Sequence, residues 1–394
     1  MCSNRKAGKK PNVVLIIVGF IGLALVAAVL LILYIWKVNP DVKINKKNFP
    51  DDGFRDWVSQ YTDRDKDGVL SAWEQDDVSD IRLDNSPNAS DDDKIKDLTG
   101  LRFFKHLKYL SFSWQGVSKL DIRKNTELEV LICDHNPLTE LNLKHNKALQ
   151  FLDCSATDLT VLDVREHKEL ISIFCTGDDT NEENEASKGK LEALLAGGAS
   201  RLRKLDCGYN RLTVLEIGSP DLVELDIMSN KIEKLDVKGA AALENLYCSD
   251  NPITELDLQD NLNLEVLMCE DCRLTTLDIS HKPVLYQVSC KGNDLTEIDA
   301  SDAPGLNILE CSNNRMTKLN LGSARELRTL DCSNNKLTNL DISGCISLST
   351  LDCSNNYIGT LNVNRIYSLK SVCCDETTQL TGRKEYFKIE RKKN

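Results

Sequence analysis

The residues Leu327-Arg-Thr-Leu-Asp-Cys-Ser-Asn-Asn-Lys-Leu-Thr-Asn-Leu-Asp-Ile-Ser343 form one copy of a motif that recurs along most of the chain. Its core, Leu330-Asp-Cys332, returns 21 residues later as Leu351-Asp-Cys353. The same phase extends back to Leu110 and forward to Val372, which gives thirteen copies with one step of 20 residues and one of 32. A fixed period of this length indicates one structural unit stacked on copies of itself.

Each copy has an internal order that predicts how it packs. Leu at the first and fourth positions and Cys at the sixth fill the core under a short strand. Segments such as 159–164 and 337–342 follow and are expected to be extended, so the convex side should carry little helix. Asn at the ninth position can bond the backbone of adjacent coils, and we expect Thr157, Asp178 and Cys272 to break this ladder. The ladder residues are Asn136, Asn210, Asn230, Asn251, Asn293, Asn314, Asn335 and Asn356.

The repeat pattern L-x-x-L-x-C-x-x-N-x-L-x-x-L-x-[ILV] resembles the leucine-rich repeat, with Cys where Leu usually closes the strand. The cysteine-bearing, 21-residue version is similar to the repeats of internalin-like bacterial surface proteins. The resemblance covers residues 95–380, about 13 coils. It implies an α/β fold class, namely a solenoid with a parallel β-sheet on its concave face.

Fifteen cysteines raise the question of disulfides or metal binding. Eleven of them occupy the sixth repeat position, where a free Cys packs as a small buried hydrophobe. Disulfides or a thiol–metal site remain the alternative. Cys2, Cys272, Cys345 and Cys373 lie outside this ladder.

Charge and composition exclude some classes of function. The net charge is −12, from 49 basic and 61 acidic residues, and no basic stripe suited to nucleic acid is present. No metalloprotease helix, nucleophile elbow or phosphate loop occurs. The sequence therefore predicts that the chain is not an enzyme.

The amino end predicts membrane attachment. Residues 1–11 contain four basic groups and no acid, and residues 13–36 then run for 24 residues without a charge. At 1.5 Å per residue such a helix spans about 36 Å, enough to cross a bilayer. A cleaved signal peptide is the alternative, but the apolar run is long and no small-x-small site precedes Lys37. We therefore expect a cytoplasmic tail (1–11), a transmembrane signal-anchor helix (12–36) and an extracytoplasmic remainder.

A polar linker (37–48) is expected to lead into a helix with Phe54, Trp57, Val58 and Tyr61 on one face. The loop that follows has the spacing of a calcium-binding EF-hand, with Gly68 at its sharp turn. An acidic surface turn is the alternative. The predicted Ca²⁺ ligands are Asp63, Asp65, Asp67, Val69 through its carbonyl, Ser71 and Glu74.

Residues 49–82 also resemble the single EF-hand that precedes the repeats in some bacterial surface proteins. The resemblance implies a small helical cap over the first coil, with calcium in a structural role. The 32-residue step is expected to contain an insertion (176–200) with helical turns between Lys188 and Leu195. This insertion is either a tolerated edge loop or a contact loop. Residues 381–394 are expected to form a short C-terminal tail.

Apolar side chains on the concave face are the predicted ligand-binding site, since contiguous exposed patches usually mark contacts. A membrane-anchored receptor or adhesin for a protein or glycan is the function this favours. The alternative is an envelope scaffold or spacer without a dedicated ligand, on which these side chains only pack against one another. The candidate residues are Tyr109, Val130, Ile132, Phe151, Phe174, Tyr247, Val266, Met268 and Ile308.

The membrane topology is testable on intact cells. Because the basic residues precede the apolar run, the amino end should stay inside and the repeats outside. Protease added to the cells should remove the repeat domain and leave a small membrane-bound fragment detectable by an N-terminal tag. Release of the whole repeat domain into the medium, with a new amino end near residue 36, would contradict the anchor.

Overall fold

The computed structural model describes residues 40–177, 189–382 and 387–392. The expected cytoplasmic tail and the apolar segment 12–36 lie outside the described residues. In the part of the chain that the structure describes, no helix is both long and apolar enough to cross a membrane.

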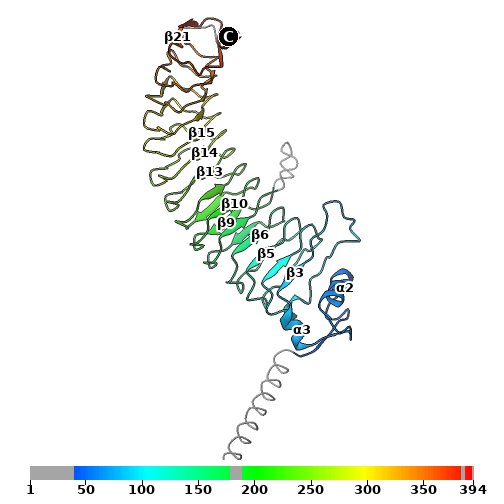
Figure 1. The fold of residues 1–394 in the computed structure, drawn as a ribbon. Helices are drawn as coiled ribbons and strands as arrows, with labels where there is room; N and C mark the ends of the chain where they lie inside the picture. The colour runs from blue at the N-terminus through cyan, green and yellow to red at the C-terminus, as the bar shows by residue number, and fades with distance from the viewer. Residues whose placement is uncertain (1–39, 178–188, 383–386, 393–394) are drawn as a thin grey trace, which may run out of the picture.

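The repeats form a curved solenoid with one continuous sheet of 15 strands, in which every pair of neighbours is parallel (Figure 1). The register places the central apolar residue of each strand beside that of the next, as in Leu330 and Leu351. The strands are β3 (Asp80–Arg82), β4 (Tyr109–Ser111), β5 (Val130–Ile132), β6 (Phe151–Asp153), β8 (Ser172–Phe174), β10 (Lys204–Asp206), β12 (Glu224–Asp226), β13 (Asn245–Tyr247), β14 (Val266–Met268), β15 (Gln287–Ser289), β17 (Ile308–Glu310), β19 (Thr329–Asp331), β20 (Thr350–Asp352), β22 (Ser371–Asp375) and β24 (Lys388–Lys392).

The convex wall is extended, as predicted. It contains three small parallel sheets, and the only described helices lie before the second strand of the main sheet. The convex strands are β7 (Val161–Asp163), β9 (Ala193–Ala196), β11 (Val214–Ile217), β16 (Glu297–Asp299), β18 (Lys318–Asn320), β21 (Thr360–Asn362) and β23 (Gln379–Thr381). The described helices are α2 (Asp52–Tyr61), α3 (Ala72–Asp77) and the 3₁₀ turn η1 (Leu101–Phe103).

The repeated Leu and Cys side chains form one core along the solenoid. Leu330 and Cys332 are both fully buried, and each buried Leu contributes about 1.5–3 kcal/mol of hydrophobic stabilisation. All fourteen described cysteines are free and buried. Burial raises the pKa of the Cys290 thiol to about 12, so the thiol stays protonated and unreactive. These cysteines act as packing residues.

The predicted asparagine ladder connects successive coils. The side-chain nitrogen of Asn335 donates to the carbonyl of Cys311 in the preceding coil at 3.0 Å and to Cys332 in its own coil at 3.2 Å. Its oxygen accepts the N–H of Met316 at 2.9 Å. The predicted break at Cys272 is partial. Its thiol donates to the Cys248 carbonyl at 3.5 Å in place of the amide N–H, but it lacks the amide oxygen that accepts a backbone N–H of the preceding coil at the Asn positions.

A second buried polar column lies in the turns that follow the convex wall, and the sequence analysis missed it. Asn146 donates to the carbonyl of Ile122 at 3.0 Å and to that of Asn125 at 2.7 Å. One coil later His167 takes the same place, and its Nε2 donates to the carbonyl of Leu143 at 3.0 Å. His167 is 2% exposed, and its Nδ1 has no hydrogen-bond partner.

The 32-residue step differs from the prediction. Helical turns were expected between Lys188 and Leu195, but strand β9 begins at Ala193 and pairs with β7 and β11. Leu191, Leu194 and Ala196 are buried in the positions that convex residues occupy in other coils. The inserted chain is therefore confined to the stretch between Cys175 and Leu191. The segment 178–188 inside it lies outside the described residues.

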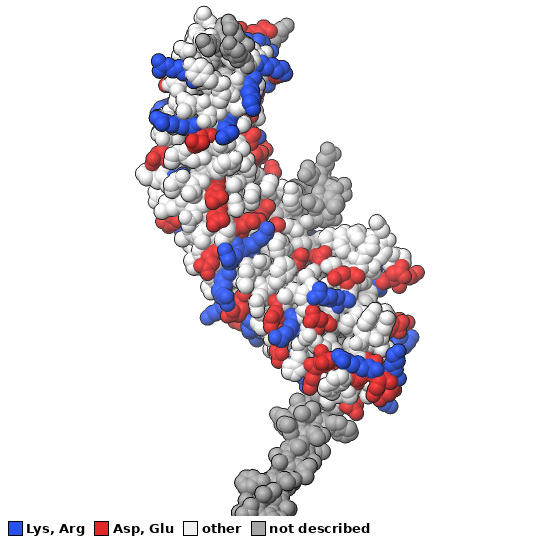
Figure 2. All heavy atoms as spheres, in the orientation of Figure 1, with Lys and Arg blue, Asp and Glu red and all other residues white. Residues whose placement is uncertain are grey.

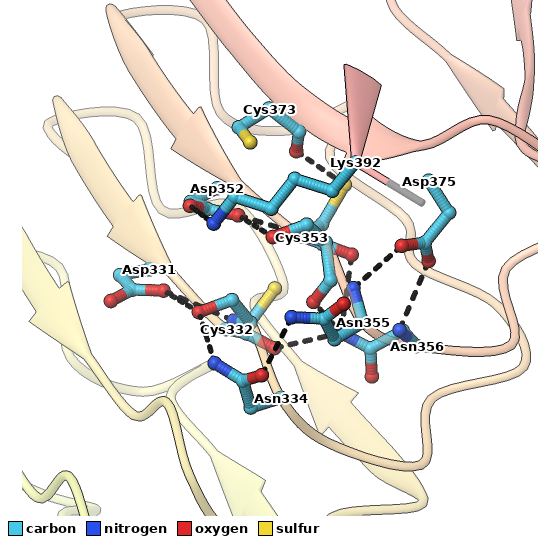
Figure 3. A network of polar contacts seen from close by, with 12 residues as sticks. Asp331, Cys332, Asn334, Asp352, Cys353, Asn355, Asn356, Cys373, Asp375 and Lys392 are labelled. Atoms are coloured by element: carbon cyan, nitrogen blue, oxygen red, sulfur yellow. Dashed lines mark hydrogen bonds and ion pairs between the residues drawn. The ribbon is translucent and has the colours of Figure 1, made fainter. Parts of the chain in front are cut away.

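The carboxyl end also differs from the expected tail, since strand β24 adds a final strand to the main sheet. Beside it, the fully buried Asp375 accepts the backbone N–H of Asn355 at 2.7 Å and that of Asn356 at 3.0 Å (Figure 3). Arg391 donates to the Asp375 carbonyl at 2.7 Å. The Asp375 carboxylate thus accepts backbone N–H groups beside the last Asn of the ladder, and the Arg391 hydrogen bond holds β24 against Asp375.

His167 should make stability depend on pH. Burial lowers the pKa of this imidazole below its ordinary value, and Lys147 lowers it further, while the Leu143 carbonyl and Glu166 partly oppose this. The folded state therefore resists protonation, so stability is complete above the unfolded pKa of about 6.5 and is lost as the pH falls below it. His167→Asn, which copies Asn146, should lose less stability between pH 7.5 and 5.5 in thermal unfolding. Equal losses in both proteins would show that His167 does not titrate with unfolding.

Candidate functional sites

The first candidate site is the loop between α2 and α3. Asp51 caps α2, because its side chain accepts the N–H of Phe54 at 3.0 Å. Its second oxygen accepts the N–H of Lys96 at 2.9 Å, which connects the helix to the start of the repeats. Of the predicted apolar face of this helix, Phe54 and Val58 are fully buried in the core and Trp57 is half-buried, whereas Tyr61 is exposed.

The loop contains a two-residue strand, β2 (Val69–Leu70), that pairs antiparallel with β1 (Val42–Lys43). The expected linker 37–48 is thus part of the folded cap from residue 40. Ile44 donates its N–H to the Gly68 carbonyl at 2.9 Å, and the Gln75 side chain donates to the Pro40 carbonyl at 2.9 Å. The chain leading out of residues 1–39 is therefore hydrogen-bonded directly to the loop.

Three of the six predicted ligands converge. A carboxylate oxygen from each of Asp63, Asp65 and Asp67 lies within 4.8 Å of the other two. Asp63 is 4% exposed and accepts the N–H groups of Asp67 at 3.2 Å and Gly68 at 3.0 Å. Gly68 has φ +80°, the left-handed conformation that a side chain would oppose. The Asp67 amide lowers the pKa of Asp65, but desolvation and the surrounding carboxylates outweigh it and raise that pKa.

Two of the remaining ligands, Ser71 and Glu74, belong to the start of α3. Ser71 caps this helix, and Glu74 returns the contact by accepting the Ser71 N–H and hydroxyl, each at 2.8 Å. The other Glu74 oxygen accepts the N–H of Arg64 at 2.8 Å. Burial raises the pKa of Glu74, but these hydrogen bonds outweigh it and lower that pKa. Glu74 is thus kept ionised at the edge of the loop, although the structure does not place it in the three-aspartate cluster.

This donor set fits calcium chemistry. All the side-chain groups are oxygens, and hard cations such as Ca²⁺ prefer carboxylates and carbonyls. The three carboxylates repel one another, and the nearly buried Asp63 has no cationic partner among the described ion pairs. The three clustered carboxylates therefore fit one divalent cation, and Val69 on β2 would be the predicted carbonyl ligand.

The second candidate site is the concave face, where five of the predicted apolar residues form one patch over β4 to β8. Each has a half-buried side chain in these neighbouring strands. The Phe151 and Phe174 rings lie 5.5 Å apart. Arg82 lies 4.0 Å above the Tyr109 ring, and Lys204 lies 5.4 Å from the Phe174 ring. We call Tyr109, Val130, Ile132, Phe151 and Phe174 the amino-proximal patch.

The other four predicted residues form a second, looser group. Tyr247, Val266 and Met268 lie on the adjacent strands β13 and β14. Ile308 is separated from them by β15, which presents Gln287. The structure therefore does not join all nine predicted residues into one surface.

A charged stripe on β10 and β12 separates the two groups. Lys204 and Glu224 form an ion pair at 2.8 Å, and Asp206 lies beside Asp226 in register. Burial, and then the Asp226 carboxylate, raise the pKa of Asp206 to about 6. The concave face is thus divided into an apolar part near the amino end and a polar centre.

The sequence analysis missed a ring pair at the edge of the amino-proximal patch. Trp114 and His135 stack with their ring centroids 3.6 Å apart and an interplanar angle of 14°. Both have positive φ, at 59° and 52°, because they occupy the same turn in successive coils. Their separation of exactly one repeat length was the signal available in the sequence.

Comparisons with known proteins agree with this architecture. A family model described as Leucine Rich repeats (2 copies) matches residues 325–366. The functional domain of InlJ from Listeria monocytogenes, which includes a cysteine ladder, is 26% identical with a TM-score of 0.64. The alignment covers 87% of this chain and 77% of that chain. The chain has an internalin-like leucine-rich repeat fold.

Further comparisons add the fold alone. The internalin InlF of Listeria monocytogenes is 18% identical, with a TM-score of 0.64 over 84% of this chain and 97% of that chain.

A family model described as NADH-ubiquinone reductase complex 1 MLRQ subunit matches residues 12–51, most of which lie outside the described residues. No curated protein matches the sequence.

Calcium should stabilise the cap. At a hundredfold excess over Kd, a ligand that binds only the folded state adds about 2.7 kcal/mol. Thermal unfolding and the protease sensitivity of residues 49–100 should both shift with calcium, and Glu74→Gln should weaken this response. Glu255→Gln, at an exposed position on the repeats, serves as the control. If calcium changes neither measurement in the unmodified protein, the loop is not a calcium site.

Proposed function

We propose that the chain is a membrane-anchored, extracytoplasmic protein whose concave face binds a protein or glycan partner. The amino-proximal patch supports this most directly, because five half-buried apolar side chains lie in contiguous strands and no element among the described residues covers them. A structural solenoid needs only polar side chains there. Aromatic groups on a rigid parallel sheet offer large contact area at small entropic cost, as binding surfaces require.

The charged groups around the patch also support a polar-rimmed interface. Arg82 and Lys204 lie over the rings at its two ends, and the ion-paired stripe begins immediately beyond Phe174. An apolar centre with a polar rim is the usual anatomy of a protein-binding surface. Among partners, this arrangement favours a protein with an apolar projection over a fully polar glycan.

Membrane attachment and calcium binding complete the proposal. The apolar segment 12–36 would anchor the chain, and the loop of Asp63, Asp65 and Asp67 would hold one Ca²⁺ ion in a structural role. Extracellular EF-hand-like modules bind calcium at about 0.1–1 mM, which suits a site outside the cell. Calcium would then order the part of the cap that lies between the membrane and the repeats.

The alternative function is an envelope scaffold or spacer. The observation that favours it is the charged centre of the concave face, where Asp206 and Asp226 interrupt the apolar surface. A spacer requires only a rigid, elongated fold with polar surfaces, and it does not require a ligand-binding site. The two functions predict different behaviour in capture experiments.

The test is capture of partners from extracts of the cell's own envelope and of host cell surfaces. Phe151→Ser with Phe174→Ser should abolish binding of any partner held by the amino-proximal patch, because its pair of contacting phenylalanine rings is lost. The matched control is Val161→Ser with Val214→Ser, at convex positions that are 53% and 46% exposed. A partner that both variants retain, or the absence of any captured partner, would favour the scaffold.

A further inference from the structure

The main sheet has two open ends, and their backbone groups are complementary. At the amino end, Tyr109 donates its N–H to the Ser79 carbonyl, and Leu83 donates to the Ser111 carbonyl. Ser79 and Leu83 therefore turn their backbone groups toward β4. Because backbone direction alternates along a strand, the N–H and C=O groups of Asp80 and Arg82 point away from the sheet.

The opposite end shows the matching arrangement. Lys388 donates its N–H to the Lys370 carbonyl at 2.9 Å, and the Lys392 carbonyl accepts the Glu376 N–H at 3.0 Å. These groups face β22, so the backbone groups of Ile389 and Arg391 face outward. Within the described residues, β24 has β22 as its one neighbour, just as β3 has only β4. Unpaired strands of this kind are templates for pairing with another chain.

Shape favours contact between these two ends. On the convex side the last strand is β23, so β24 projects as a half-coil on the concave side alone. Beside β3 lies a groove of about 510 Å³ between the cap and the sheet. Trp57 and Tyr61 of α2 line this groove on one side, and Asp80 and Arg82 line it on the other.

We propose that β24 of one copy pairs with β3 of a second copy and continues the parallel sheet from molecule to molecule. In the register that all other strand pairs follow, Ile389 would lie beside Ile81. That register would place Lys388 beside Asp80 and Glu390 beside Arg82. Both cross-strand pairs are of opposite charge, which stabilises neighbouring strands.

The complementarity extends one step further along the strands. Two residues beyond Arg82, Asp84 would lie beside Lys392 of the other copy. In Figure 3 the Lys392 side chain lies over Asp352 at the carboxyl end of the sheet, at 3.6 Å. Figure 2 shows basic side chains gathered at this end of the solenoid. Three successive charge pairs thus fit a single register.

The same residues disfavour the central register of pairing between two carboxyl ends. In a symmetric antiparallel β24 pair centred on Glu390, Lys388 would face Lys392 and Glu390 would face its own copy. Like charges placed directly opposite one another destabilise a strand pair. The proposed contact between β24 and β3 joins unlike surfaces and is heterologous, so it generates open chains of molecules instead of closed dimers.

The experiment uses the full-length chain in detergent micelles and measures sedimentation velocity against protein concentration. The tail variant is Lys388→Asp with Glu390→Lys, and the head variant is Asp80→Lys with Arg82→Asp. The control exchanges the convex charges with Glu297→Lys and Lys318→Glu, which are exposed and distant from both ends.

The unmodified chain and the control should associate as concentration rises, and high salt should weaken this association. The tail and head variants should each associate at least about tenfold more weakly when alone, since like charges then meet. An equal mixture of the two should recover association, because each reversed end meets its complement.

Hydrogen exchange identifies the contact itself. The amides of residues 80–82 and 388–392 should exchange more slowly at high concentration in the unmodified chain and in the mixture. A chain that stays monomeric at every concentration in low salt would overturn the proposal. Association that survives both variants, or that leaves these amides unprotected, would overturn it equally. The concave-face binding test above uses Phe151 and Phe174, which lie on neither of these two end strands.

Discussion

The hydrogen bonds of the ladder side chains are the constraint on which the solenoid depends. Backbone carbonyls in the turn after each concave strand lack a partner in their own coil, and a buried carbonyl without a partner is costly. One Asn side chain supplies donors to two coils and accepts an N–H from the preceding one, as Asn335 shows. This fixes the separation and register of neighbouring coils, and the parallel sheet and its cysteine core follow from that register.

The features that repeat were predictable from the sequence, because one physical solution is used thirteen times. The concave strands, the extended convex wall and the buried cysteines all follow from the 21-residue pattern. The departures were local. Cys272 keeps the donor half of the ladder contact because a thiol is also a hydrogen-bond donor, whereas the sequence analysis considered Asn side chains alone. The sequence analysis missed the second buried polar column because its members differ in side-chain type. Asn146 and His167, for example, occupy the same buried repeat position.

Pairing across distant segments was the other limit of prediction. Nothing in the composition of residues 42–43 indicates that they pair with the loop strand at 69–70, because two-residue strands have no periodicity to read. Strand β9 was mistaken for helical turns because the run Leu191 to Ala196 lacks turn residues and is rich in helix-forming Leu and Ala. At the candidate calcium loop, the sequence identified the residues with oxygen ligands. The structure showed that the three aspartates converge, whereas Glu74 takes part in the N-terminal cap of α3.

The pairing of β1 with β2 also has a mechanical meaning. Any pull between the amino end and a partner on the concave face passes through the cap, since the cap precedes the repeats and contains β1, the first described strand. The Ile44–Gly68 and Gln75–Pro40 hydrogen bonds are the first to carry that load. They hold only a two-residue strand, whereas the strands of the main sheet between β3 and β24 are each bonded on both sides. The pairing of β1 with β2 is thus the part of the fold that gives way first under load. An ion bound in the adjacent acidic loop would determine the force at which this pairing breaks.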